Sequence, residues 1–205
     1  MLKTQNVNIV NNEFLSNNIT ENKDKGKKKQ VGLKVAYTNA DQLPNKMSEV
    51  ELFLNENNID LIGICEVLPK EPGHNISSFV IEGYTPYPSL EGRGICVFVK
   101  NNINITIVEL TNIECIFKPS VFLKITSNKS SFTLGLIYRS PNCSDEENES
   151  INSQISSAAK YSLGLGEDLV IMGDFNYPKI NWSKESCSQA ESYRYASSFL
   201  EKVHK

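Results

Sequence analysis

The sequence has few of the residues that zinc sites and disulfide-stabilised scaffolds require. Its 205 residues include two histidines, His74 and His204. The cysteines are odd in number, widely spread and without a Cys-x-x-Cys pair: Cys65, Cys96, Cys115, Cys143 and Cys187. We therefore expect neither a zinc site nor a disulfide framework, and any metal ion would be held by oxygen atoms.

Long apolar runs and an excess of positive charge are also missing. No apolar run approaches the roughly 18 residues that a membrane-spanning helix needs, and the start of the chain is rich in Asn and Lys rather than signal-like. We therefore expect an intracellular protein, nuclear or cytoplasmic, that is not secreted and has no membrane partner. The formal net charge of −3 gives no overall basic surface, so any contact with DNA must be local.

The composition predicts one folded domain that follows a polar leader. Hydrophobic residues make up 40% of the chain and aromatic residues 9%, which is ordinary for a globular protein. Residues 1–30 are polar and end in a basic run, so we expect a disordered leader there. The folded domain is expected to cover residues 31–205.

Hydrophobic periodicity predicts strands and helices in a mixed order. Alternating or short apolar segments predict strands at 33–37, 60–65, 95–99, 103–109, 120–126, 132–138 and from Val170 onward. The four strands between 95 and 138 are expected to pair antiparallel. Helical spacing predicts helices at 46–57, 145–163 and 189–203, and a loop is expected at 69–88. This pattern predicts an α+β sandwich of layered sheets with helices outside.

The most informative segment is 170–176, an apolar strand that stops at a glycine and then presents Asp174 and Asn176. Residues two apart in an extended chain point the same way, so both side chains can face one ligand. An ionised Asp can take a proton from water, and an Asn amide can donate to an oxygen that gains negative charge, which suits attack of water on a phosphate ester. An Asx turn that merely closes the strand is an equally good interpretation of this segment alone.

Two other predicted strands also end in polar residues. Asn39 and Asp41 follow the first strand, and Glu66 follows the second. Carboxylates delivered to one rim form an oxygen-lined pocket that suits Mg²⁺ or Mn²⁺. Each of these residues alone is more often a turn former, but the order Asn, Glu, Asp-x-Asn after apolar strands favours a hydrolytic metal site.

Several segments match the motifs of one known family: 37–41, 64–66, 94–100, 137–141 and 173–176. Together they span about residues 31–182. On these motifs the chain resembles the endonuclease/exonuclease/phosphatase superfamily, and within it the apurinic-like endonucleases of non-LTR retrotransposons. The stretches Tyr138-Arg139-Ser140-Pro141 and 177–182 are similar to the retrotransposon branch.

The resemblance implies a fold and a reaction. The fold would be a four-layer α/β/β/α sandwich, with two packed mixed sheets flanked by helices. The reaction would be cleavage of a DNA phosphodiester with Mg²⁺, or with Mn²⁺ in its place. The DNA phosphate backbone is the implied partner, and a longer relative would also carry a reverse transcriptase domain.

The resemblance also implies roles for individual residues. Glu66, helped by Asn39, would hold the metal ion. Asp174 would orient or deprotonate the attacking water, and Asn176 would donate to a phosphate oxygen.

Two neighbouring residues complete the implied site. Tyr138 would contact the phosphate from the far side. Arg139 would bind the DNA backbone as a planar donor, and Asn39 is implied on the substrate side as well.

The sequence departs from the family after the helix expected at 189–203. The family's later motifs, a further Asp and a terminal Asp-His pair, are not found, and His204 lacks the Asp that should precede it. We therefore expect a C-terminally incomplete domain without its last strands, with strongly reduced or absent cleavage. A noncatalytic remnant that keeps only the fold is an alternative, and a phosphatase of the same superfamily is a weaker one.

Overall fold

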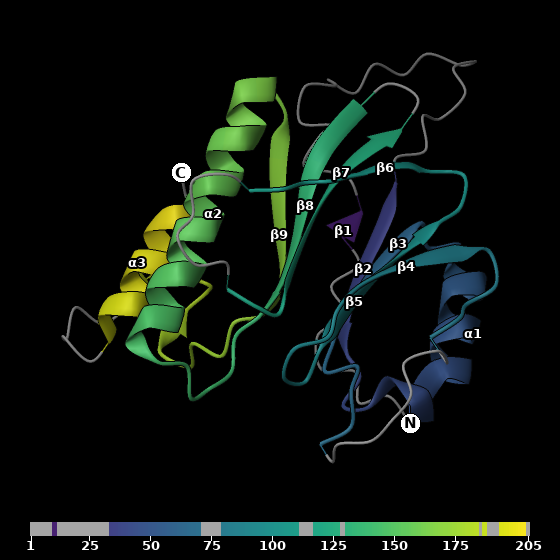
Figure 1. The fold of residues 1–205 in the computed structure, drawn as a ribbon, viewed down its shortest axis with the longest axis horizontal. Coiled ribbons are helices and arrows are strands. Elements are labelled where there is room, and N and C mark those ends of the chain that lie inside the picture. The colour runs from purple at the N-terminus through teal and green to yellow at the C-terminus, as the bar shows by residue number, and fades with distance from the viewer. Residues whose placement is uncertain are drawn as a thin grey trace.

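The computed structural model describes residues 10–11, 33–70, 79–110, 117–127, 130–184, 186–187 and 193–203. Within them lie two β-sheets, packed face to face, with helices on both outer sides (Figure 1). His74, Cys115 and His204 lie outside this part of the chain, so the predictions about them stay predictions.

The first sheet has five strands and is mixed. Across the sheet the strands are β1 (Val10–Asn11), β2 (Lys34–Asn39), β3 (Leu61–Cys65), β5 (Ile95–Lys100) and β4 (Tyr84–Ser89). β2 and β3 are parallel. The 3₁₀ helix η1 (Leu43–Lys46) and the helix α1 (Met47–Asn57) connect them. This crossover places the ends of β2 and β3 at the same edge of the sheet.

The second sheet has four strands. Their order is β6 (Asn104–Ile107), β7 (Ser120–Ser127), β8 (Ser130–Tyr138) and β9 (Asp168–Asp174). β6, β7 and β8 pair antiparallel, whereas β8 and β9 are parallel and joined through α2 (Asp145–Leu165). α2 begins with a capping box between Ser144 and Glu147, which satisfies backbone donors at its first turn.

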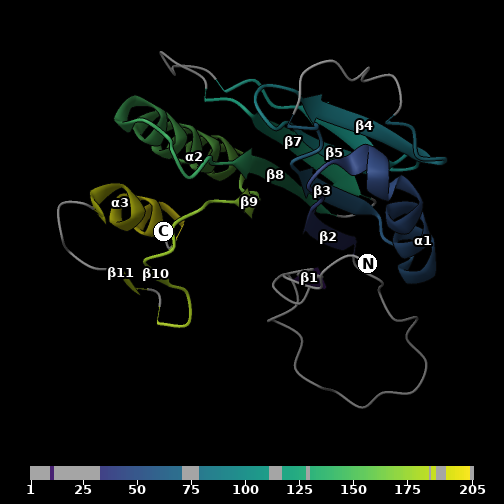
Figure 2. The same ribbon diagram turned by 90° about the horizontal axis from the view of Figure 1, so that it is seen from below.

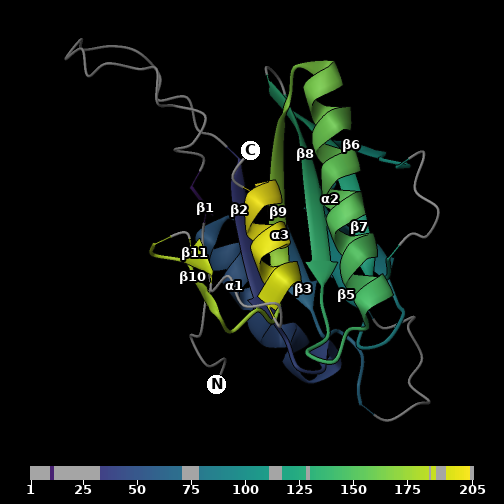
Figure 3. The same ribbon diagram turned by 90° about the vertical axis from the view of Figure 1, so that its left-hand side faces the viewer.

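The remaining elements follow β9. A short hairpin of β10 (Ile180–Asn181) and β11 (Ser186–Cys187) leads towards α3 (Arg194–Val203). Figure 3 shows α3 lying beside α2 on the outer side of the second sheet, and both helices contribute to one buried apolar cluster. None of the helices in the described residues is both long and apolar enough to cross a membrane.

The layers are held together by three apolar clusters. The cluster between the two sheets includes Leu61, Val97, Leu134 and Leu136, which are all fully or almost fully buried. A second cluster lies between α1 and the first sheet, and a third lies between the second sheet and α2 with α3. Seen from below in Figure 2, the order is α1, sheet, sheet, α2 with α3. The predicted four-layer α/β/β/α sandwich is confirmed.

Several predicted boundaries were wrong. The predicted loop 69–88 contains most of β4, an edge strand that includes Pro86 and Pro88. β5 pairs with β3 and β4 in the first sheet instead of joining the antiparallel strands that follow it. The last helix is described from Arg194, and the hairpin of β10 and β11 was not predicted.

The predicted leader is only partly described. Val10 and Asn11 pair antiparallel with β2, where Val10 lies opposite Val35. The other residues from 1 to 32 lie outside the described residues, so the disorder expected there stays a prediction.

Candidate active site

The predicted site residues lie at the ends of four strands. Asn39 ends β2, Tyr138 ends β8, Asp174 ends β9, and Glu66 directly follows β3. β2 and β3 are parallel, as are β8 and β9, so within each sheet two of these residues meet at one edge. Packing of the sheets then brings the two edges together.

Asn39 connects the two sheets at this edge. Its Nδ2 donates to Oε1 of Glu66 at 3.1 Å and to Oδ2 of Asp174 at 3.4 Å. Its Oδ1 accepts from the backbone N–H of Asp41 at 3.0 Å. The structure therefore brings together three residues that the sequence predicted, with Asn39 as the donor between two carboxylates.

The backbone at this edge adopts unusual conformations. Glu66 has φ 54° and Asn176 has φ 46°, both in the left-handed region, where a non-glycine residue costs about 1–2 kcal/mol. Gly173 has φ 150°, and a Cβ there would lie 1.8 Å from the carbonyl oxygen of Ile137. Only glycine fits this close approach of β9 to β8, which sets Asp174 beside Tyr138.

The surroundings of Asp174 favour its protonated form. Burial raises the pKa of the carboxyl group, and the negative charge of Glu66 adds to this effect. Hydrogen bonds from the Asn176 backbone and from Asn39 act in the opposite direction but do not cancel the rise. A carboxylate with a raised pKa is a better proton acceptor than a surface Asp.

Tyr138 lies close to both carboxylates and is buried. Burial raises the pKa of its phenol to about 12, and the charges of Glu66 and Asp174 and a hydrogen bond with Glu66 contribute to the rise. The phenol therefore keeps its proton at neutral pH and can donate a hydrogen bond.

Asn176 is turned back towards β8. Its backbone N–H donates to Oδ1 of Asp174 at 3.2 Å, the contact expected of an Asx turn. Its Nδ2 donates to the carbonyl oxygen of Arg139 at 2.7 Å. The Asx turn that the sequence left open is therefore present, and the catalytic roles of Asp174 and Asn176 stay predictions.

Arg139 does not lie on the surface. The residue is 8% exposed, its Nε donates to Oδ1 of Asn148 at 2.8 Å, and its Nη1 donates to the carbonyl oxygen of Asn176 at 3.0 Å. The guanidinium also lies 4.2 Å from the ring centre of Tyr177. The guanidinium thus links the loop after β9 to α2. The contact of Arg139 with the DNA backbone stays a prediction.

Arg93 is a residue of the site that sequence reasoning missed. Its Nη2 donates to Oδ1 of Asp41 at 2.7 Å and to Oε2 of Glu66 at 2.8 Å. The hydrogen bond from Arg93 lowers the pKa of Asp41, which the sequence indicated only as a turn residue. The available signal was the turn Glu91-Gly92-Arg93-Gly94, whose last residue begins the matched motif 94–100.

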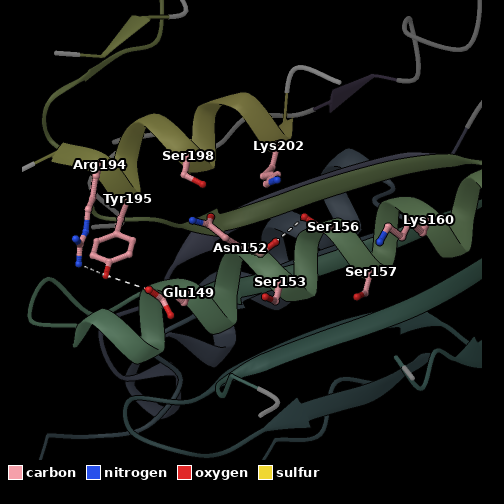
Figure 4. A pocket seen from close by; sticks show the side chains of 10 residues that line it. All are labelled: Glu149, Asn152, Ser153, Ser156, Ser157, Lys160, Arg194, Tyr195, Ser198 and Lys202. Atoms are coloured by element: carbon pink, nitrogen blue, oxygen red, sulfur yellow. Dashed lines mark hydrogen bonds between the residues drawn. The ribbon is translucent and has the colours of Figure 1, made fainter. Parts of the chain in front are cut away.

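Among the hollows of the described residues, one contains predicted site residues and another lies between two helices. A pocket of about 540 Å³ runs along β2 and β9, and Asp174, Asn176 and Trp182 are among its lining residues. A groove of about 690 Å³ lies between α2 and α3 (Figure 4), lined mainly by Ser, Lys and other polar residues. The groove holds none of the predicted site residues, so the chemistry is to be sought at the strand ends.

Comparison with known proteins agrees with this geometry. The model of the Endonuclease/Exonuclease/phosphatase family matches residues 22–189, which is more than half of the chain. The chain belongs to this family. Members of the endonuclease/exonuclease/phosphatase family are hydrolases that act on phosphodiester bonds. No curated protein sequence matches the chain significantly.

Solved structures of the endonuclease/exonuclease/phosphatase family share the fold. The endonuclease domain of TRAS1, a telomere-specific non-LTR retrotransposon, superposes with a TM-score of 0.58 at 17% identity, over 83% of this chain and 71% of that domain. The AP endonuclease LMAP from Leishmania major gives 0.59 at 12% identity, over 84% of this chain and 65% of that protein. The chain thus spans about two thirds of the length of these neighbours.

Nucleases of the endonuclease/exonuclease/phosphatase family generally use divalent metal ions. The described residues contain no group of three or more His, Cys, Asp or Glu that could hold an ion. Mg²⁺ needs only one or two carboxylates, because it keeps several of its water ligands. At the strand ends the carboxylate oxygens of Glu66 and Asp174 are linked through Asn39.

Proposed function

We propose that this chain is a divalent-cation-dependent phosphodiesterase that nicks DNA, of the kind encoded by non-LTR retrotransposons. The observation that supports it most is the link from Asn39 to Glu66 at 3.1 Å and to Asp174 at 3.4 Å, which gathers two carboxylates from different sheets. A merely structural turn at each strand end would not need this contact between residues 135 positions apart.

Each carboxylate has its own task in this proposal. Glu66 would hold the cation, which supplies Lewis-acid polarisation of the phosphate when bound. Asp174, whose pKa burial raises, takes the proton of the attacking water. Asn39 orients both carboxylates through its Nδ2, and its predicted help in holding the cation and its predicted place on the substrate side remain part of the proposal.

Hydrogen-bond donors would stabilise the charge that develops on the phosphate. The Tyr138 phenol stays protonated and can donate to a phosphate oxygen. One amide hydrogen of Asn176 is used on the carbonyl of Arg139. The Asn176 side chain also makes a hydrogen bond to Asp174 that lowers the pKa of that carboxyl, so its second donor would reach a phosphate oxygen by leaving Asp174.

DNA as the substrate is supported by neighbours in the family. The 3′ phosphatase NExo from Neisseria, with a TM-score of 0.52 and 12% identity, was solved bound to a product DNA hairpin. The chain has no overall positive charge, so we propose contacts confined to the phosphates at this edge. A reverse transcriptase domain in a longer relative and the reduced rate of this chain stay predictions.

The test is nicking of a supercoiled plasmid by the purified chain with Mg²⁺, with EDTA, and with the variant Glu66→Gln. We expect slow nicking that requires Mg²⁺ and is lost in the variant. Nicking that is equal with EDTA, or equal in Glu66→Gln, would contradict the proposed role of the cation. A phosphatase would instead release inorganic phosphate from a 3′-phosphorylated oligonucleotide without nicking the plasmid.

A further inference from the structure

Arg93 lies beside Glu66, at the position that the proposed function assigns to the divalent cation. Its Nη2 lies 2.8 Å from Oε2 of Glu66, the carboxylate that would hold the divalent ion. Both side chains are largely buried, at 17% exposure for Arg93 and 19% for Glu66. Because water screens charges little at such a site, a guanidinium and a divalent cation repel each other strongly when they share one carboxylate.

The turn that carries Arg93 is fixed to the chain that follows Glu66. The N–H of Leu68 donates to the carbonyl of Arg93 at 2.9 Å, and the N–H of Val67 donates to the carbonyl of Gly94 at 3.2 Å. Gly94 has φ 64° and packs against Leu68, where a Cβ would lie 3.0 Å away. The backbone of Arg93 is therefore anchored, and a change of partner would involve its side chain alone.

Part of the Arg93 guanidinium has no partner. Nε and Nη1 are buried and make no hydrogen bond to any described residue. Buried donors are rarely left unpaired, so such donors indicate a missing acceptor. Nε and the Nη atoms form the planar fork that binds phosphate oxygens with two hydrogen bonds.

We propose that Arg93 couples cation binding to DNA binding. Without substrate its guanidinium neutralises Glu66 and opposes the divalent cation. With substrate it exchanges Glu66 for a phosphate oxygen of DNA, which leaves the carboxylate to the cation. This inference rests on the proposed function, since it requires that the cation binds at Glu66. It predicts that DNA and the cation each strengthen binding of the other.

The test measures Mn²⁺ binding to the full chain by electron paramagnetic resonance, first without DNA. Arg93→Ala and the bulkier Arg93→Gln should each bind Mn²⁺ about tenfold more tightly than wild type. Lys118→Ala is the matched control, because Lys118 pairs with Glu91 of the same turn at 3.2 Å and does not touch Glu66. Its affinity should equal that of wild type, and melting temperatures show that each variant is folded.

The second arm adds a DNA duplex in an Asp174→Asn background, which blocks cleavage. DNA should tighten Mn²⁺ binding when Arg93 is present and have little effect in Arg93→Gln. Equal or weaker Mn²⁺ binding by both Arg93 variants without DNA, or equal tightening by DNA in both backgrounds, overturns the proposal.

A Glu66→Gln variant distinguishes failure of the proposal about Arg93 from failure of the proposed function. If Glu66→Gln loses Mn²⁺ binding while the Arg93 variants match wild type, only the role of Arg93 is wrong. If Glu66→Gln binds Mn²⁺ as wild type does, the cation site itself is wrong.

Discussion

Replacement of Arg139 tests whether this residue holds the site together or contacts DNA. Its guanidinium joins the end of β8 to α2 and to the loop that follows β9. Nε donates to Asn148 on α2 at 2.8 Å, Nη1 donates to the carbonyl of Asn176 at 3.0 Å, and the ring of Tyr177 lies 4.2 Å away. The backbone N–H of Arg139 also donates to the carbonyl of Asp174 at 2.8 Å, and substitution leaves that contact in place.

The size of the effect follows from these contacts. A hydrogen bond to a charged group contributes about 1.5–3 kcal/mol, and a cation–π contact of this kind contributes about 0.5–2 kcal/mol. Oδ1 of Asn148 keeps a second donor, the hydroxyl of Tyr177 at 3.1 Å, which reduces the loss. We expect Arg139→Ala to lower the free energy of unfolding by about 3–5 kcal/mol. Arg139→Lys, which keeps the charge but not the planar fork, should lower it by about 1–3 kcal/mol.

Two measurements on the same preparations decide whether Arg139 stabilises the fold or contacts DNA. Urea denaturation gives the free energy of unfolding, and DNA affinity measured against salt concentration gives the number of phosphate contacts. Arg194→Lys is the control, since the exposed pair of Arg194 with Asp145 at 2.9 Å should contribute less than about 1 kcal/mol. Unchanged stability in Arg139→Lys, together with a salt slope reduced by about one, would refute the buried role and favour the DNA contact first predicted.

Three further substitutions test the site. Asp174→Asn should be more stable than wild type at neutral pH in metal-free buffer. The raised pKa of Asp174 means that its stabilising effect is present below the ordinary value of 3.8 and is lost as pH rises through the raised pKa. The difference should therefore shrink in acid, which urea denaturation across pH measures. Gly173→Ala should lose about 3 kcal/mol of unfolding free energy, whereas Gly164→Ala, with open space around it, should not be destabilised. Tyr138→Phe should slow nicking about 10²-fold while changing stability by less than about 1 kcal/mol, and an unchanged nicking rate would exclude its phenol from the reaction.

The strand ends were predictable because their signal is local. An apolar strand that stops at a polar residue can be recognised from a few neighbours, which is how Asn39, Glu66 and Asp174 were found. The four-layer fold followed from the family resemblance and agrees with the order of strands and helices. The pairing of Asn39 with Asp174 could only be expected in general terms, because it depends on how two sheets pack.

The features that the sequence did not predict are β4 and the surroundings of Arg93 and Arg139. They depend on contacts that no local pattern reveals. β4 lies largely within the segment predicted as a loop, and it contains Pro86 and Pro88, which an edge strand tolerates. With β4 missing, the turn that carries Arg93 had no predicted position near Glu66. The burial of Arg139 depends on Asn148, which α2 brings back over the end of β8. The positions of Arg93 and Arg139 could therefore be known only from the tertiary structure.

The measurement that tests the central claim most directly is nicking of supercoiled plasmid with Mg²⁺ by wild type, Asp174→Asn and Asp168→Asn at equal folded concentration. The two aspartates lie at opposite ends of β9, and only Asp174 meets Asn39. We expect slow nicking by wild type and by Asp168→Asn, and none by Asp174→Asn. Equal nicking by all three proteins, or none by wild type, would contradict a hydrolytic site at the meeting point of the two sheets.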